Sequence, residues 1–409
     1  MKDKLLQLLK QNKNELTVFS FLCANLLLFF TKETYMSDGI YPMHLVDTAI
    51  GFKTRTLVGA ISGLLWEHPT KNNIFFLHLT VTLLTFFLVA VFLGGCIKKA
   101  DEKTGKILLY ISIIVAVLPY GFRSYINLFE LLDIYWVLSA VLCLLSAQGK
   151  RTLYLIPVFI ITGLWVHYAF LLAFMPLIYI LCFNACYREG SKRTYALTLV
   201  MIITSVSFTL YFLLTMRKFD VISFEEFTEY IIEKAGDKIT AFESYVGVSF
   251  RPTTPDMLEY YTERYDAPEN IFDIPPFFTY AYFYLKSAIG DTSLAGIICD
   301  IILASPLVAF FIAVWKKAVK KASDKKEKFL YFLCLITPIV HAVSLFTSSD
   351  TSRWLSIAVI SNLFLLAVFI KDRSATVGDA LIDIISKTQK HKRILLPVLI
   401  FYLSIIFIW

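Results

Sequence analysis

The chain has 409 residues, of which 57% are hydrophobic and 17% charged, and its mean hydropathy is +0.66. Soluble globular proteins carry about 25% charged residues. A bilayer core ~30 Å thick takes ~20 apolar residues per helix, and apolar stretches of that length recur from end to end of this sequence. The composition therefore excludes an ordinary soluble enzyme and predicts an all-α, polytopic membrane protein.

Hydropathy along the chain predicts about eleven membrane-spanning helices. They cover approximately residues 16–31, 74–96, 107–122, 131–147, 152–167, 168–184, 195–214, 292–315, 329–346, 354–370 and 394–409. The first stretch follows four lysines, as a signal peptide would, but no small-residue cleavage site comes after it. We therefore expect it to remain as the first span.

The net charge of +7 is sorted between the two predicted sides of the membrane. With the N-terminus inside, the inner connectors hold 26 of the 39 Lys and Arg residues. Because an excess of Lys and Arg marks the cytoplasmic side, the sequence predicts an N-in, C-out orientation in the cell (plasma or inner) membrane. Because membrane orientation already accounts for these Lys and Arg residues, they give no reason to expect a nucleic-acid partner.

Two long polar segments on the predicted outer side interrupt the helices. They divide the chain into an N-terminal membrane module (1–214) with a first outer segment (32–73), a large outer segment (215–291) and a C-terminal membrane module (292–409). Long connections of this kind are often functional. The inner connectors are short, although residues 378–385 predict a modest surface helix.

Both outer segments contain an amphipathic pattern. Apolar residues recur at a period near 3.6 in Thr48–Trp66, and Phe224, Phe227, Ile231 and Ile232 alternate with acidic residues in the second segment. Such patterns predict helices that lie in the membrane interface.

Ionisable residues gather at the predicted outer rim of the bundle. Charges at the hydrocarbon edge are costly unless they are paired or hydrated, so their convergence predicts a polar cavity that opens outward. The candidate residues are Asp38, His44, Asp47, Arg55, Arg123, Glu130, Asp133, His167, Asp350 and Arg353.

The three arginines of this set, Arg55, Arg123 and Arg353, are candidates to bind phosphate, since a guanidinium group grips phosphate with two parallel hydrogen bonds. Arg353 has an alternative role in a simple i,i+3 pair with Asp350.

Asp38 and Asp47 are candidate general bases, because an acid at an apolar interface has its pKa raised by desolvation. A turn at Asp38-Gly39 and an N-cap at Asp47 are the structural alternatives. Glu130 and Asp133 open a predicted helix, whose dipole favours acids there.

His167 is either catalytic or an interfacial histidine with satisfied hydrogen bonds. Asp300 is the one carboxylate well inside a predicted span. A buried acid of this kind keeps a transporter of lipid-linked glycans or small solutes open as an alternative.

The layout of residues 1–215 resembles the GT-C class of membrane glycosyltransferases. In that class the first outer segment carries an essential acid, which the resemblance places at Asp38 or Asp47, and acids precede the fourth span, as Glu130 and Asp133 do. The first outer segment has no Asp-x-Asp or Asp-Glu pair, so no metal or other cofactor is indicated.

The chain also resembles bacterial O-antigen and capsule polymerases, which rely on arginine and histidine rather than an acid. Both resemblances imply transfer of a sugar or glycan from a polyprenyl-phosphate or polyprenyl-diphosphate carrier to a hydroxyl group of a glycan or lipid acceptor. Arginines that neutralise the leaving phosphate, and a group that deprotonates or orients the acceptor, are then expected.

Overall fold

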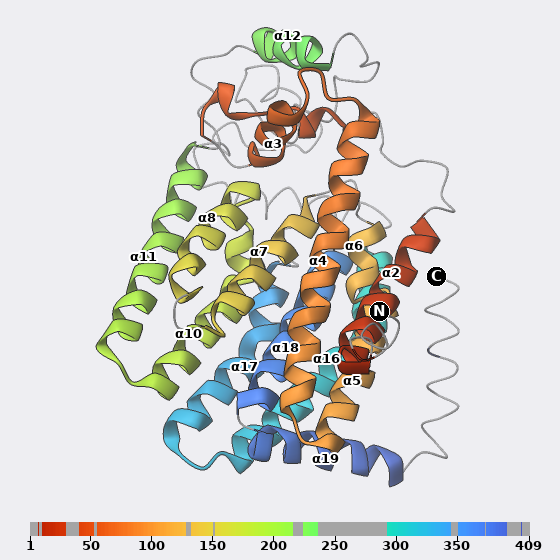
Figure 1. Cartoon of the computed structure of the whole chain (residues 1–409), viewed down its shortest axis with the longest axis vertical. Helices are drawn as coiled ribbons and strands as arrows, with labels where there is room; N and C mark the ends of the chain where they lie inside the picture. Colours follow the sequence, from red (N-terminus) through yellow and green to blue (C-terminus); the bar gives the residue numbers. More distant parts are fainter. Residues whose placement is uncertain are drawn as a thin grey trace.

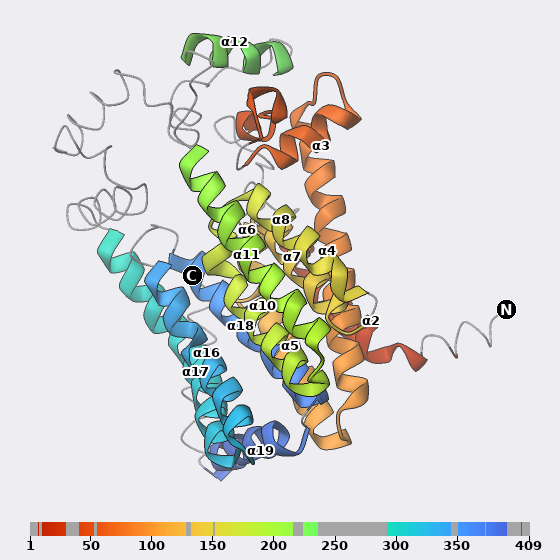
Figure 2. The same ribbon diagram turned by 90° about the vertical axis from the view of Figure 1, so that its left-hand side faces the viewer.

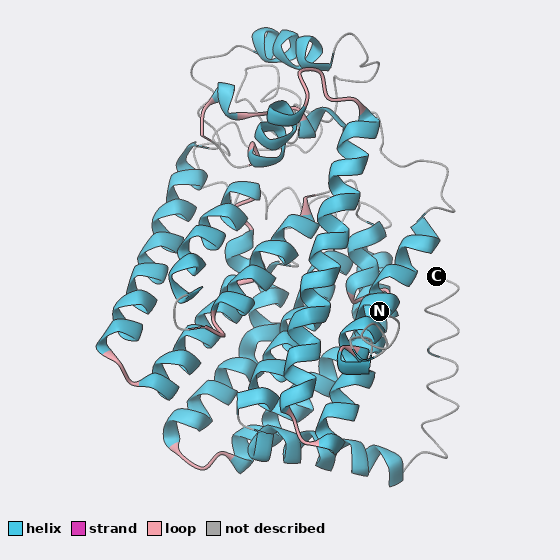
Figure 3. Cartoon of the chain, viewed as in Figure 1, coloured by secondary structure: helices cyan, strands magenta, loops and turns pink. Residues whose placement is uncertain are grey.

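A computed structural model describes residues 7, 10–29, 41–52, 55–127, 132–149, 152–215, 224–235, 293–344, 351–372, 374–390 and 402. All regular structure within these residues is helical, as predicted (Figure 3).

The long helices form one bundle (Figure 1). Its helices are α2 (Lys13–Phe29), α4 (Lys71–Lys99), α5 (Glu102–Val117), α6 (Phe122–Asn127), α7 (Asp133–Ser146), α8 (Ile156–Val166), α9 (Phe170–Ala173), α10 (Met175–Glu189), α11 (Lys192–Thr215), α16 (Ser293–Lys321), α17 (Lys325–Ser344) and α18 (Thr351–Asp372). Each of the first ten predicted spans overlaps one or more of these helices. The eleventh, 394–409, lies outside the described residues except for residue 402.

Five helical stretches of the described chain are long and apolar enough to cross a membrane. They are Lys71–Lys99, Glu102–Ser124, Lys192–Phe212, Gly296–Lys321 and Thr351–Asp372. These stretches support the prediction of an all-α membrane protein.

Helix α18 forms the centre of the bundle. It is buried along almost its whole length and packs against α4, α5, α10, α16 and α17. A helix that is apolar all round suits such a buried position. Its polar Asn362 is satisfied, because Trp315 Nε1 donates to Asn362 Oδ1 at 2.8 Å. Helices α16 and α17 run side by side along one edge of the bundle (Figure 2).

Both ends of α18 carry a charge of the sign that the helix dipole disfavours. Arg353 lies in its first turn, and Asp372 is its last residue. At the Asp372 end, Arg188 Nη1 lies 2.8 Å from Asp372 Oδ2, and Asn184 Nδ2 donates to the same oxygen at 3.0 Å. These partners from α10 make the buried carboxylate tolerable and fix α10 against α18.

The segments predicted to lie on opposite sides of the membrane lie at opposite ends of the bundle. At one end, the α3 end, are the 3₁₀ turns η1 (Tyr41–His44) and η2 (Thr48–Ile50) and the helices α3 (Leu57–Leu65) and α12 (Phe224–Ala235) (Figure 1). At the other, the α19 end, is α19 (Ser374–Lys390), which includes the predicted surface helix. Its Asp383 binds Lys317 and Lys321 of α16 at 3.2 and 2.9 Å.

The amphipathic helix predicted over Thr48–Trp66 is broken into two pieces. Gly51 and Arg55 have φ angles of 106° and 70°, which no α-helix can contain, so η2 ends at Ile50 and α3 begins at Leu57. The helical period therefore holds only in the second half of that stretch. The amphipathic helix predicted in the second long segment is confirmed as α12.

Helix α3 approaches the preceding chain closely at Gly59, whereas Gly63, one turn later, has ordinary space around it. A Cβ atom on Gly59 would lie 1.9 Å from the carbonyl oxygen of Val46. One on Gly63 would lie 3.5 Å from Lys234 Nζ and 3.6 Å from Asp47 Oδ2, which is ordinary contact.

We expect Gly59→Ala to destabilise the first long segment by ~1–3 kcal/mol through overpacking against backbone. Gly63→Ala is the matched control, and the gain in helix propensity should keep it at least as stable as the wild type. Thermal unfolding and limited proteolysis of the detergent-purified protein measure both. Equal behaviour of the two variants would contradict the close approach of α3.

Candidate functional site

Three helix ends meet the first long segment at the α3 end of the bundle. The N-terminus of α7 supplies Asp133, the N-terminus of α18 supplies Arg353, and the turn after α8 supplies His167. Arg55 joins them from the segment between η2 and α3. These four residues, which sequence analysis placed on one rim, are called the polar cluster below.

Arg353 and Asp133 form a buried ion pair. Arg353 Nε lies 2.7 Å from Asp133 Oδ2, and the two side chains are 15% and 4% exposed. Asp133 also lies at the positive end of the α7 dipole, as the sequence predicted, whereas Arg353 opposes the dipole of α18. The carboxylate therefore compensates a guanidinium group that its own helix disfavours.

Arg55 is held in a strained backbone conformation. Its φ of 70° makes it the one non-glycine residue with positive φ in the described chain. Such a conformation costs ~1–2 kcal/mol in an L-residue. The Arg55 N–H donates to Trp165 O at 2.8 Å, in the last turn of α8, where the helix dipole favours a cation. Strain that persists in this way is typical of functional sites.

His167 accepts a hydrogen bond from Arg55, because Arg55 Nη2 lies 2.6 Å from His167 Nε2 and a guanidinium group only donates. The Ala169 nitrogen lies 3.1 Å from the other ring nitrogen, Nδ1, but a neutral imidazole accepts at one nitrogen only, and that nitrogen is Nε2. Because Nε2 accepts the hydrogen bond from Arg55, it carries a lone pair, so the ring is not the doubly protonated imidazolium. The ring is therefore neutral, and in this arrangement it orients the Arg55 side chain.

Aromatic side chains that sequence analysis did not select enclose the polar cluster. Trp136, one turn after Asp133, meets His167 edge to face at 5.5 Å between ring centroids. Trp165 Nε1 donates to Thr56 Oγ1 at 2.8 Å and packs on Phe52 with centroids 4.7 Å apart. In the sequence, these aromatic residues could have been found only from their positions a few residues from Asp133, His167 and Arg55.

His44 is buried within the protein and does not face an outward-opening cavity of the kind that the sequence predicted. It is fully buried in η1, and its ring meets that of His78 edge to face at 4.7 Å. His78 in turn meets Tyr135 of α7 at 5.3 Å. His44 thus packs the first long segment onto α4 and α7.

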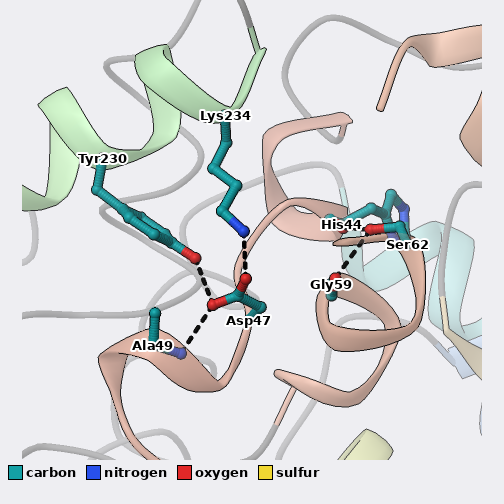
Figure 4. A network of polar contacts seen from close by, with 7 residues as sticks. All are labelled: His44, Asp47, Ala49, Gly59, Ser62, Tyr230 and Lys234. Carbon is teal, nitrogen blue, oxygen red and sulfur yellow. Dashed lines mark hydrogen bonds and ion pairs between the residues drawn. The ribbon is translucent and has the colours of Figure 1, made fainter. Parts of the chain in front are cut away.

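Asp47 is the N-cap of η2 and also joins α12 to η2 (Figure 4). Its Oδ1 accepts from Ala49 N–H at 2.7 Å and from the Tyr230 hydroxyl at 2.5 Å, and its Oδ2 pairs with Lys234. Burial alone would raise the pKa of Asp47, but the hydrogen bonds from Lys234, Tyr230 and Ala49 outweigh it and lower that pKa. The capping alternative is confirmed, and the carboxylate is ionised.

The remaining candidates lie on other helices or outside the described residues. Arg123 lies on α6, which packs against α2, α5 and α18. Asp38, Glu130 and Asp350 lie outside the described residues. Asp300 on α16 accepts a hydrogen bond from the Tyr120 hydroxyl at 2.8 Å. Among the described residues, no group of three or more His, Cys, Asp or Glu is placed to hold a metal ion.

No protein-family model, curated protein or solved structure matches the chain. The contacts of the site itself must therefore carry any functional argument.

The Asp133–Arg353 pair generates a stability prediction. We expect Asp133→Asn to destabilise the protein by ~3–5 kcal/mol, because it leaves a buried guanidinium group without its counter-charge. The double variant Asp133→Asn/Arg353→Gln should recover most of that loss. Thermal unfolding in detergent compares the three proteins, and a double variant as unstable as Asp133→Asn would exclude this pairing.

Proposed function

We propose that the protein is a membrane glycosyltransferase that moves a sugar or glycan from a polyprenyl-phosphate-type carrier to a hydroxyl acceptor in cell-surface polysaccharide assembly. The observation that supports the proposal most directly is the convergence of Arg55, Arg353 and His167 at one end of the bundle.

The charge of the polar cluster suits a phosphate ligand. Two guanidinium groups, one carboxylate and a neutral imidazole leave a net positive charge. In the proposed reaction the acceptor oxygen attacks the anomeric carbon while the bond to the lipid phosphate breaks. Donors already aimed at the position where negative charge develops lower the barrier most.

The proposed orientation places the polar cluster on the outer face of the cell membrane. It has the N-terminus inside, about eleven spans and the C-terminus outside. The carrier lipid would then reach the cluster from the surrounding bilayer. The segments rich in Lys and Arg at the α19 end fit the cytoplasmic side of this orientation.

A repeat-unit polymerase of the O-antigen or capsule type is the second candidate, and the state of Asp47 favours it. Both oxygens of this carboxylate are engaged by Ala49, Tyr230 and Lys234. These hydrogen bonds lower the pKa of Asp47, which makes it a weaker base toward an acceptor hydroxyl than a free carboxylate would be. Chemistry that rests on arginine and histidine does not require Asp47 to act as a base.

The strained Arg55 gives a test of the phosphate role. Arg55→Asn should still fold, because Asn tolerates positive φ better and this offsets the loss of the hydrogen bond to His167. Arg55→Lys keeps the charge and loses the planar fork. We expect both variants to fold and to lose most of the polyprenyl-phosphate lipid that co-purifies with the wild type in mild detergent, as quantified by mass spectrometry.

Lys10→Ala, an exposed lysine that precedes the start of α2, is the control, and its lipid recovery should equal that of the wild type. If wild-type protein carries no polyprenyl-phosphate lipid, or if Arg55→Lys retains all of it, the phosphate role of Arg55 is wrong.

The orientation is tested with alkaline phosphatase, which needs an oxidising compartment for its disulfides. A fusion after Thr215 should be active in cells, and fusions after Gly190 and Lys390 should be inactive. The opposite pattern would place the polar cluster in the cytoplasm and exclude an outward-facing site.

A further inference from the structure

The two long segments at the α3 end are joined through one face of α12. Tyr230 and Lys234, one helical turn apart, both bind the carboxylate of Asp47 (Figure 4). The adjacent row on the helix, Ile231 and Ala235, is buried at 0% and 2% exposure. Ile232 on the other side is 37% exposed. Helix α12 therefore reaches η2 through its polar row, and a buried apolar row lies directly beside that contact.

The Asp47–Lys234 contact lies beside α3. Gly63 of α3 faces it, with Lys234 Nζ and Asp47 Oδ2 within about 4 Å of where a Cβ atom would lie. The Asp47 and Lys234 side chains are 13% and 26% exposed, so water screens the pair only in part. The N–H of Ala49 supplies a third donor, which fixes the direction of the carboxylate.

We propose that Asp47 is a positioning residue whose carboxylate holds α12 against η2 and α3. Helix α12, the part of the second long segment that the structure describes, is then fixed to the first long segment at the end of the bundle that carries the polar cluster. The inference does not rest on the proposed glycosyl transfer, because it concerns only the placement of α12.

The two roles of Asp47 make different demands on its partners. A general base needs the carboxylate but not Lys234. A positioning residue needs both the carboxylate and Lys234. Loss of either one should therefore expose the same buried row of α12. Asp47→Asn retains the N-cap, since Asn caps as well as Asp, while it removes the charge. Lys234→Met removes the charge and keeps the apolar stem.

The test measures thiol labelling of purified full-length protein in mild detergent, so that membrane sidedness does not enter. A maleimide is applied to Ile231→Cys, with Ile232→Cys as the matched exposed control, both in a Cys299→Ser background, because Cys299 is the exposed cysteine of the chain. Ala235→Cys, a milder change on the same buried row, is the second reporter.

Labelling of Ile231→Cys and Ala235→Cys should be slow with Asp47 and Lys234 present, and about tenfold faster with Asp47→Asn or Lys234→Met, because the local opening that exposes the row becomes easier. The Asp47→Asn/Lys234→Met double variant should label no faster than either single variant, as expected of two residues in one interaction. Ile232→Cys should label at one rate throughout.

Two outcomes would overturn the proposal. The first is that both buried reporters stay protected in Asp47→Asn and in Lys234→Met. The second is that both label as fast as Ile232→Cys in the presence of Asp47 and Lys234, since α12 would then not be held at all.

Discussion

Charge at the ends of a buried helix is the constraint on which this structure depends. Helix α18 is buried along its length, yet Arg353 stands in its first turn and Asp372 at its end, each against the helix dipole. An uncompensated charge in such a place is strongly destabilising. Each therefore requires an opposite charge from another helix, and these come from Asp133 of α7 and Arg188 of α10.

The polar cluster follows from that requirement. Asp133 draws the N-terminus of α7 to that of α18, and Trp136 on the same face of α7 meets His167 beyond the end of α8. His167 in turn accepts from Arg55, which the first long segment supplies in a strained conformation. The structural pair thus brings a second guanidinium group close to the first and leaves the cluster positively charged. This connection between stability and charge is why we place the proposed phosphate site here.

The local sequence pattern was sufficient to predict the helices, but it did not show which side chains pair between them. Hydropathy predicted the helices of the bundle, and the 3.6-residue period predicted α12, because each depends on neighbours in sequence. The same period failed across Gly51 and Arg55, whose φ angles are positive; Arg55 is bonded there to the last turn of α8. The predicted rim correctly grouped Arg55, Asp133, His167 and Arg353, since topology alone brings helix ends to one level.

The sequence did not show which of these residues bind one another, or that Asp47 binds Lys234 of another segment. Arg55 and His167 are 112 residues apart, and Asp47 and Lys234 are 187 apart. Nothing local distinguishes an aspartate that caps η2 from one that also binds α12. Asp133 was interpreted from its position at a helix N-terminus, and its ion pair with Arg353 became visible only once the structure placed the N-termini of α7 and α18 together.

The central claim is that the polar cluster recognises the phosphate of a polyprenyl lipid. It is tested most directly by native mass spectrometry of the protein titrated with a polyprenyl phosphate and, separately, with the polyprenol of the same chain length. The account predicts that the phosphate binds at least ~10-fold more tightly, in line with a charge-assisted hydrogen bond, and that Arg55→Lys removes most of that difference. Equal affinity for the phosphate and the alcohol in the wild-type protein would contradict it.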